Sequence, residues 1–169
     1  MDEWTDIVHT YTKPLLHISY LYVKDFHAAE DIVQEVLIAF FEKRHQFEAR
    51  ASLKTYLTRM TINRSKDYLK SWRYRSQQLT TYFTGGYAER NEMIKAEERL
   101  EIAEAVLALP VKYREMIILY FYEHYTLKEI SELLHCPMST VHYRCQKAQE
   151  KLKAVLHADE WELLLDERD

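Results

Sequence analysis

Residues 126–148 read TLKEISELLHCPMSTVHYRCQKA and carry the clearest structural signals in the chain. Thr126 and Glu129 have the spacing of a capping box, in which a hydroxyl and a carboxylate satisfy the free amides of a helix's first turn. Pro137 cannot donate a hydrogen bond to a preceding helix, and its fixed φ suits the first turn of a new one. The stretch therefore predicts two helices joined by a tight turn at residues 135–137.

The second of these helices, expected over about residues 138–156, has a buried face and an outward face. Apolar side chains recur at steps of four, three, four and three, which places them on one buried stripe: Val141, Cys145, Ala148, Leu152 and Val155. The outward side chains near its start, with Arg144 at the flank, can all form hydrogen bonds, and no carboxylate occurs before Glu150. The outward residues are Ser139, Thr140, His142, Tyr143, Gln146 and Lys147.

A helix that enters the major groove of DNA needs such an outward face, because its side chains must bond base edges and phosphates without repelling the backbone. Together with the capped helix and the tight turn before it, the pattern predicts a helix-turn-helix whose second helix reads DNA. An ordinary helical hairpin with a solvated polar face is the alternative explanation of the same residues.

The whole chain has the composition of an all-α protein. Its 169 residues are 47% hydrophobic and 30% charged, which suits a folded protein of one ordinary domain or two small ones. Two glycines and three prolines are too few for the many turns of an all-β fold or for a glycine-rich phosphate loop. We expect an all-α fold of two small helical domains joined by a flexible linker, the second domain with the helix-turn-helix.

Breaks in the helical periodicity set the expected boundaries. We expect a first domain over residues 1–76, a linker over 77–98, a second domain over 99–157 and an acidic tail over 158–169. The tail is either a short amphipathic helix or a loose end. In the first domain we expect helices over about 7–21, 27–41 and 52–75, with an irregularity or a break at Pro14 and an N-cap at Ser52.

The helix expected over residues 52–75 combines positive charge with aromatic rings. Residues 50–76 hold eight Lys and Arg against the single acid Asp67, although the whole chain has a net charge of −4. At 100° per residue, one side is expected to be apolar: Leu53, Tyr56, Leu57, Met60 and Tyr68. The opposite side forms a narrow polar stripe: Arg59, Asn63, Lys66, Lys70 and Arg73.

Four rings accompany this stripe: Tyr56, Tyr68, Trp72 and Tyr74. A cationic track beside aromatic faces is typical of proteins that hold single-stranded nucleic acid, because unpaired bases stack on the rings. The same tyrosines also fit a helical core, so we expect most of them to pack inward and only some to meet bases.

No pattern in the sequence indicates an enzyme. The spacing of the histidines and of the two cysteines, Cys136 and Cys145, matches no standard zinc motif, and no nucleophile lies in a recognisable constellation. We therefore expect no catalytic residue, no metal and no cofactor. The N-terminal residues lack the order of a signal peptide and no stretch is long enough to span a bilayer, so we expect a cytoplasmic protein with reduced thiols.

Three motifs together resemble the extracytoplasmic-function (ECF) sigma factors of the sigma-70 family, and the resemblance covers nearly the whole chain. The first is AAEDIVQEV over residues 28–36, which is similar to the segment with which these factors dock on RNA polymerase. The second is SLKTYLTRMTIN over residues 52–63, which resembles the element that reads and melts the minus-ten promoter region. The third combines Leu109-Pro110 and Tyr113-Arg114-Glu115 with residues 126–134 and 139–141, and resembles the domain that reads the minus-thirty-five region.

The resemblance implies a role for each motif. Polymerase docking would use Asp31, Gln34 and Glu35. Minus-ten DNA would be contacted by Arg59, Asn63, Lys66, Lys70 and Arg73. Minus-thirty-five DNA would be contacted by Ser139, Thr140, His142, Tyr143, Arg144 and Lys147. The expected partners are core RNA polymerase, promoter DNA and a cognate anti-sigma factor, and the expected function is to direct polymerase to promoters and to help melt them.

Two other functions compete with this interpretation. A stand-alone helix-turn-helix transcriptional regulator that binds duplex DNA as a dimer explains the second domain, but it leaves the basic aromatic helix without a role. An interaction protein that uses only its helical faces explains the acidic segments, and it predicts that Arg59, Lys66 and Lys147 can be lost without effect.

Overall fold

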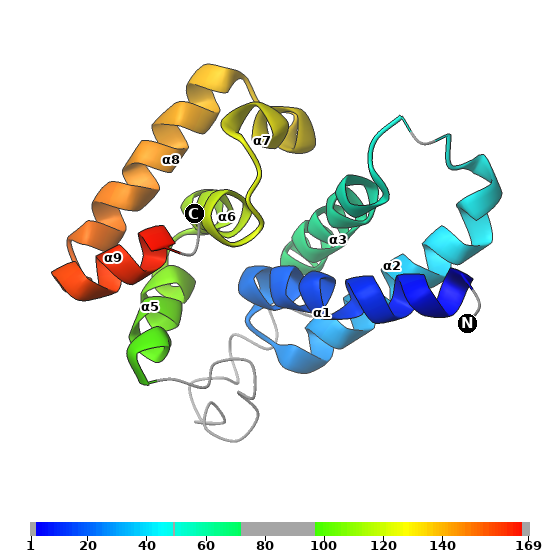
Figure 1. Cartoon of the computed structure of the whole chain (residues 1–169), viewed down its shortest axis with the longest axis horizontal. Coiled ribbons are helices and arrows are strands. Elements are labelled where there is room, and N and C mark those ends of the chain that lie inside the picture. The colour runs from blue at the N-terminus through cyan, green and yellow to red at the C-terminus, as the bar shows by residue number, and fades with distance from the viewer. Residues whose placement is uncertain (1–2, 49, 72–96, 167–169) are drawn as a thin grey trace. The chain divides into compact units, whose positions relative to one another are not determined.

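The computed structural model describes residues 3–48, 50–71 and 97–166, and this part of the chain contains helices and turns but no strand (Figure 1). The chain divides into two compact units, residues 1–82 and 83–169. The expected all-α fold of two helical domains is therefore confirmed. No helix within the described ranges is long and apolar enough to cross a membrane.

The described residues of the first unit form a bundle of three mutually packed helices. These are α1 (Glu3–Val23), α2 (Phe26–Lys43), which is followed by the 3₁₀ turn η1 (Arg44–Gln46), and α3 (Leu53–Lys70). Helix α2 begins where the Asp25 side chain accepts a hydrogen bond from the Ala28 amide at 3.0 Å. Helix α3 begins as expected at Ser52, whose hydroxyl accepts from the Thr55 amide at 3.1 Å.

Helix α1 runs through Pro14 without a break, so the expected interruption there was wrong. A proline inside a helix removes one hydrogen bond and weakens the helix locally. Packing against both α2 and α3 compensates for this loss, because α1 buries a long apolar face: Leu15, Ile18, Leu21, Tyr22 and Val23. Tertiary contacts rather than local propensity thus decide the length of this helix.

The buried face of α3 lies elsewhere than the apolar pattern indicated. Of the five side chains expected inside, only Leu57 is buried, and the other four are half-buried. The buried positions are instead mostly small hydroxyl residues: Leu57, Thr58, Thr61, Ile62 and Ser65. Ser65 Oγ shares a hydrogen bond with Ser19 Oγ of α1 at 3.1 Å, and the Thr61 hydroxyl donates to the Leu57 carbonyl at 2.9 Å. Small side chains with satisfied hydroxyls therefore fill this helix contact.

The described residues of the second unit, 97–166, contain six helical segments. They are α5 (Glu97–Ala108), α6 (Val111–Ile117), the π-helical turn η3 (Ile118–Tyr122), α7 (Leu127–Leu134), α8 (Met138–Lys153) and α9 (Ala158–Asp166). Helix α6 packs along α8, and α7 packs on both η3 and α8. The fully buried centre comes from α6 and η3, from α7 and from α8: Met116, Ile117, Ile118, Leu119, Phe121, Ile130 and Leu152.

The expected helix-turn-helix is present in α7 and α8 (Figure 1). The Thr126 hydroxyl accepts from the Glu129 amide at 3.2 Å while the Glu129 carboxylate accepts from the Thr126 amide at 2.7 Å, which confirms the capping box. His135 ends α7 in the left-handed conformation, with φ of 53°. Helix α8 ends at Lys153, so Val155, which was expected in its buried stripe, lies outside the helix and is 67% exposed.

The C-terminal tail, for which two states were expected, forms helix α9. Leu164 is fully buried, and the Trp161 ring lies 6.3 Å from the Phe121 ring of η3, centroid to centroid. The Glu160 carboxylate accepts a hydrogen bond from the His157 amide at 2.6 Å, which caps the start of the helix. Helix α9 packs on α5 and α8, so the tail belongs to the core of the second unit.

Candidate nucleic-acid interface

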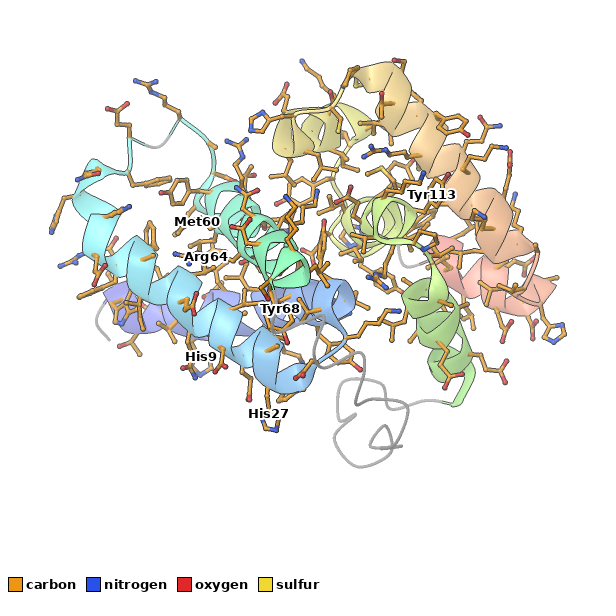
Figure 2. All side chains as sticks on the ribbon, turned by 180° about the vertical axis from the view of Figure 1, so that it is seen from behind. His9, His27, Met60, Arg64, Tyr68 and Tyr113 are labelled. Carbon is orange, nitrogen blue, oxygen red and sulfur yellow. The ribbon has the colours of Figure 1, made fainter. Side chains whose placement is uncertain are left out.

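A groove of about 570 Å³ runs between α2 and α3 in the first unit. Asp31, Gln34 and Glu35 all line it and are all exposed, so the sequence-predicted docking residues do lie together on one surface. Figure 2 shows Arg64 and Tyr68 on α3 and His27 near the start of α2, all of which also line the groove. Arg64, which sequence reasoning missed, forms an ion pair with Glu35, Nη1 to Oε2 at 3.2 Å.

The chemistry of this groove favours a cationic and partly apolar partner. Four carboxylates line it: Asp25, Asp31, Glu35 and Asp67. The Arg64 guanidinium offsets only part of this negative charge. The lining also includes Ile38, a large apolar side chain that is 57% exposed and therefore offers contact area to a partner. The groove thus attracts positive charge on its acidic lining and apolar side chains at Ile38.

The outer face of α3 carries the expected polar stripe. Arg59, Asn63, Lys66 and Lys70 follow one another at steps of four, three and four, so they share one side of the helix. Asn63 and Lys70 are exposed, whereas Arg59 and Lys66 are half-buried. Arg73, the fifth member of the predicted stripe, lies outside the described residues.

Of the four aromatic rings expected beside this stripe, the structure describes two, Tyr56 and Tyr68. The Tyr56 ring packs against Phe40 of α2 and Phe47, with centroid distances of 6.0 and 5.1 Å. Tyr68 is half-buried and lines the groove between α2 and α3. Trp72 and Tyr74 lie outside the described residues. Tyr56 therefore stabilises the bundle.

The outward face of α8 presents Ser139, His142 and Tyr143, all exposed, with Thr140 half-buried. Tyr143 has more than half of its surface, 56%, accessible to solvent. These four side chains occupy the first two turns of the second helix of the helix-turn-helix. That is the part of such a helix that meets base edges in the major groove.

Lys147, the next predicted DNA contact, forms a hydrogen bond with the carboxylate of Glu150. From the sequence, Glu150 was noted only as the first acid in this helix. Glu150 accepts from Lys147 Nζ at 2.8 Å and from Gln146 Nε2 at 3.2 Å. The hydrogen bond raises the pKa of Lys147 above its usual value and lowers the pKa of Glu150. Lys147 therefore stays protonated, and its ammonium group is held near the middle of α8.

Arg144 is placed differently from the other predicted contacts on α8. Its Nη1 lies 3.6 Å from Oε1 of Glu115 on α6 and 3.8 Å from Sγ of Cys136 in the turn. Glu115 was quoted in the third motif but was given no role, and its side chain is only 3% exposed. A charged residue directly before the apolar run Met116-Ile117-Ile118-Leu119 was the available signal for a buried ion pair.

Among the described residues, no three His, Cys, Asp or Glu side chains form a cluster suited to a metal ion. Both cysteines are free thiols. The surfaces described so far suit binding: an acidic groove, a polar stripe and the outward face of α8.

Comparison with known proteins gives two family matches. Residues 7–75 match the model of sigma-70 region 2, and residues 99–152 match a model of sigma-70 region 4. The chain is 29% identical over 167 residues to the ECF RNA polymerase sigma factor SigW of Bacillus subtilis, covering 92% of this chain and 89% of SigW. It is 27% identical over 176 residues to SigX of the same organism, covering 99% of this chain and 91% of SigX.

Solved structures show the same fold. The sigma factor RpoE from Bartonella quintana, crystallised with the anti-sigma factor NepR, matches with a TM-score of 0.77 at 19% identity, over 94% of this chain and 99% of RpoE. CnrH in complex with the cytosolic domain of CnrY matches with a TM-score of 0.64, also at 19% identity, over 92% of this chain and 88% of CnrH.

Proposed function

We infer that this chain, which belongs to the ECF type of the sigma-70 family, directs core RNA polymerase to specific promoters and helps to melt the DNA there. The observation that carries this conclusion is the order of the two matches, region 2 over residues 7–75 and region 4 over residues 99–152. The polymerase performs the chemistry, so we propose no enzymatic step, metal or cofactor for this chain.

Docking on polymerase is assigned to the groove between α2 and α3, through Asp31, Gln34 and Glu35. The acidic lining and the exposed Ile38 support this assignment, because they suit a partner surface that carries both cations and apolar side chains. Docking aligns the two DNA-binding faces of the chain with two promoter elements. Two weak contacts on one scaffold then act as one strong contact.

Minus-ten recognition is assigned to the outer face of α3, through Arg59, Asn63, Lys66 and Lys70, and to Arg73, which lies outside the described residues. The cations hold the phosphate backbone, and extruded bases exchange stacking in the duplex for contacts with protein. This exchange explains how melting can proceed without ATP.

Minus-thirty-five recognition is assigned to α8, through Ser139, Thr140, His142, Tyr143 and Lys147. Hydroxyl, imidazole and phenol groups match the hydrogen-bonding edges of bases in the major groove, and a lysine matches phosphate. Arg144, expected in the same set, is considered separately below because it pairs with Glu115.

Two further proposals concern the setting of the protein. Both solved structures described above contain an anti-sigma factor or the cytosolic domain of a partner protein, NepR with RpoE and CnrY with CnrH. We propose that a cognate anti-sigma factor also holds this chain inactive. We place its activity in the cytoplasm, where core polymerase and promoter DNA are found.

Co-purification with core RNA polymerase tests the proposed function. We expect the wild-type chain to bind core enzyme and the double variant Asp31→Lys, Glu35→Lys to lose binding, because the reversal repels a cationic partner. The matched control is Asp159→Lys, Glu162→Lys, which reverses two exposed acids of α9 and should bind like the wild type. Circular dichroism verifies that each variant is folded.

Failure of the wild-type chain to bind core enzyme would overturn the proposed function. Tight binding of the free chain to promoter duplex in that case would favour the stand-alone regulator. Equal loss in the charge-reversed variant and its control would instead indicate a general charge effect and remove only the groove assignment.

A further inference from the structure

Glu115 is a buried carboxylate in the contact between α6 and α8. Its side chain is 3% exposed, and the residue lies in a run of buried positions on α6: Tyr113, Arg114, Glu115, Met116 and Ile117. Burying a carboxylate costs free energy unless a cation and hydrogen bonds compensate for the lost water. Arg144 Nη1, at 3.6 Å, supplies a positive charge from α8.

Arg144 connects three parts of the helix-turn-helix. Its guanidinium lies beside Glu115 of α6 and also 3.8 Å from the Cys136 sulfur, in the turn between α7 and α8. A guanidinium is planar and carries five N–H donors in fixed directions, so it can hold several groups in a defined geometry. One side chain of α8 therefore ties this helix both to α6 and to the turn that precedes it.

The position of Arg144 around α8 supports an inward role. At about 100° per residue, Arg144 lies roughly 60° from Val141 and roughly 40° from Ala148, both of which are fully buried. His142, an exposed member of the DNA-reading face, lies roughly 160° away around the helix. Thr140 lies roughly 40° away in the other direction, so the arginine lies at the border between the buried stripe and the outward face, from where it reaches Glu115 with 28% of its side chain exposed.

We propose that Arg144 is a positioning residue for minus-thirty-five recognition, which acts by pairing with Glu115 and does not bind a base or a phosphate. The pair sets the rotation of α8 about its own axis, and this rotation determines which base edges the outward side chains reach. The proposal rests on the proposed function, since it concerns how the same DNA-reading helix is held.

The test compares holoenzymes assembled from core polymerase and either wild-type chain or variants. Each is measured for binding to a promoter with its minus-thirty-five element intact and to one with that element scrambled, at several salt concentrations. We expect Arg144→Gln and Glu115→Gln each to lower the ratio of the two affinities by about tenfold, because contacting residues couple by energies of this order. The double variant should be no worse than either single variant.

The salt dependence separates positioning from direct contact. A residue that neutralises one phosphate lowers the slope of log K against log salt by about one unit when it is removed. We expect the slope to stay at the wild-type value in both variants. A slope reduced by about one in Arg144→Gln, with an unchanged affinity ratio in Glu115→Gln, would overturn the proposal and make Arg144 a phosphate contact.

Conservative variants keep the test decisive if loss of the buried charge pair unfolds the second unit. Glu115→Asp and Arg144→Lys retain both charges but change the geometry, and each should lower the affinity ratio by about threefold while circular dichroism shows a folded chain. An unchanged ratio in both folded variants would show that the pair serves stability alone. A wild-type holoenzyme that ignores the minus-thirty-five element would instead contradict the proposed function, independently of Arg144.

Discussion

At the scale of single residues, Lys147 illustrates how a functional side chain is prepared. The bond to Glu150 raises the pKa of its ammonium group and limits its motion, so less conformational entropy is lost on binding. We expect Lys147→Ala to lower the salt slope of minus-thirty-five binding by about one unit, because one phosphate contact is lost. Filter-binding measurements of the holoenzyme on promoter DNA, made from low to moderate salt concentration, give this slope. Lys153→Ala, at the far end of α8, is the control, and an unchanged slope in Lys147→Ala would exclude a phosphate contact there.

His135 ends helix α7 in a backbone conformation that is unfavourable for a residue with a side chain. It adopts φ of 53° and ψ of 42° at the end of α7, a conformation that costs roughly 1 kcal/mol for a residue with a Cβ atom. We expect His135→Gly to raise the free energy of unfolding by up to about 1 kcal/mol, since glycine adopts this conformation without strain. Urea denaturation measures the change. Lys128→Gly, within helical α7, should destabilise by a similar amount, and a destabilised His135→Gly would contradict the account.

At the scale of elements, the outer face of α3 is expected to act in melting and not in docking. We expect the double variant Arg59→Ala, Asn63→Ala to lower the fraction of open complexes by about tenfold, because contacts to unpaired DNA are lost. Permanganate reactivity of unpaired thymines measures melting, and co-purification measures docking, which should be unaffected. Lys54→Ala, an exposed position near the start of α3 and outside the stripe, is the matched control. Normal promoter opening by the double variant would remove the minus-ten assignment.

The contact between α5 and α9 is expected to depend on pH. A hydrogen bond between the carboxyl groups of Glu101 and Glu160 raises the pKa of Glu101 and lowers the pKa of Glu160. A raised carboxyl pKa stabilises the folded chain below its ordinary value of 4.5 and loses that effect as pH rises through the folded-state pKa. The lowered pKa of Glu160 acts in the opposite sense, stabilising above 4.5 and failing only in more acidic solution.

We therefore expect Glu101→Gln to raise the melting temperature at pH 7, since an amide donates to Glu160 without having to keep a proton. The advantage over the wild type should shrink as pH falls toward 4.5, where Glu101 itself becomes protonated. Thermal denaturation at several pH values measures the difference, with Glu162→Gln, an exposed carboxylate on α9, as the control. Parallel curves for Glu101→Gln and wild type at all pH values would show that the two carboxyl groups do not interact.

Local chemistry made some elements predictable, and tertiary packing decided the rest. Ser52 and the Thr126–Glu129 capping box satisfy helix amides within one turn, so sequence spacing alone identified both helix starts. Pro14 was misjudged because contacts from α2 and α3, distant in sequence, hold α1 together. The buried hydroxyls of α3, such as Ser65, look polar in a pattern and become core only when a partner such as Ser19 meets them.

In the candidate site, the sequence likewise predicted which residues share a helix face but not the contacts between helices. Surface positions on α2, α3 and α8 follow from helical periodicity, and the grouping of Asp31 with Glu35 needed nothing more. The ion pairs Arg64–Glu35 and Arg144–Glu115 join different helices, and no spacing rule within one helix reveals them. Sequence reasoning therefore located the faces, while the contacts that hold those faces in place required the structure.

At the scale of the whole molecule, the division into two units leads us to expect, under the proposed function, that two promoter elements are read separately. Asn63 belongs to the first unit and Lys147 to the second, and each unit has its own core. When both are carried by one polymerase, their contributions to promoter binding should add as free energies, because distant sites without shared partners are independent. The promoter itself can then be used to assign each residue to its element.

We expect a promoter with a scrambled minus-thirty-five element to abolish the effect of Lys147→Ala on transcription while leaving the effect of Asn63→Ala intact. The reason is that scrambling the minus-thirty-five element already removes the contact of Lys147, so the mutation has nothing further to remove. The contact of Asn63 with the minus-ten element is still present on the scrambled promoter. Run-off transcription by each holoenzyme on both promoters measures the four combinations. If Asn63→Ala also lost its effect on the scrambled promoter, the two faces would act on one element, and the assignment of one promoter element to each unit would be wrong.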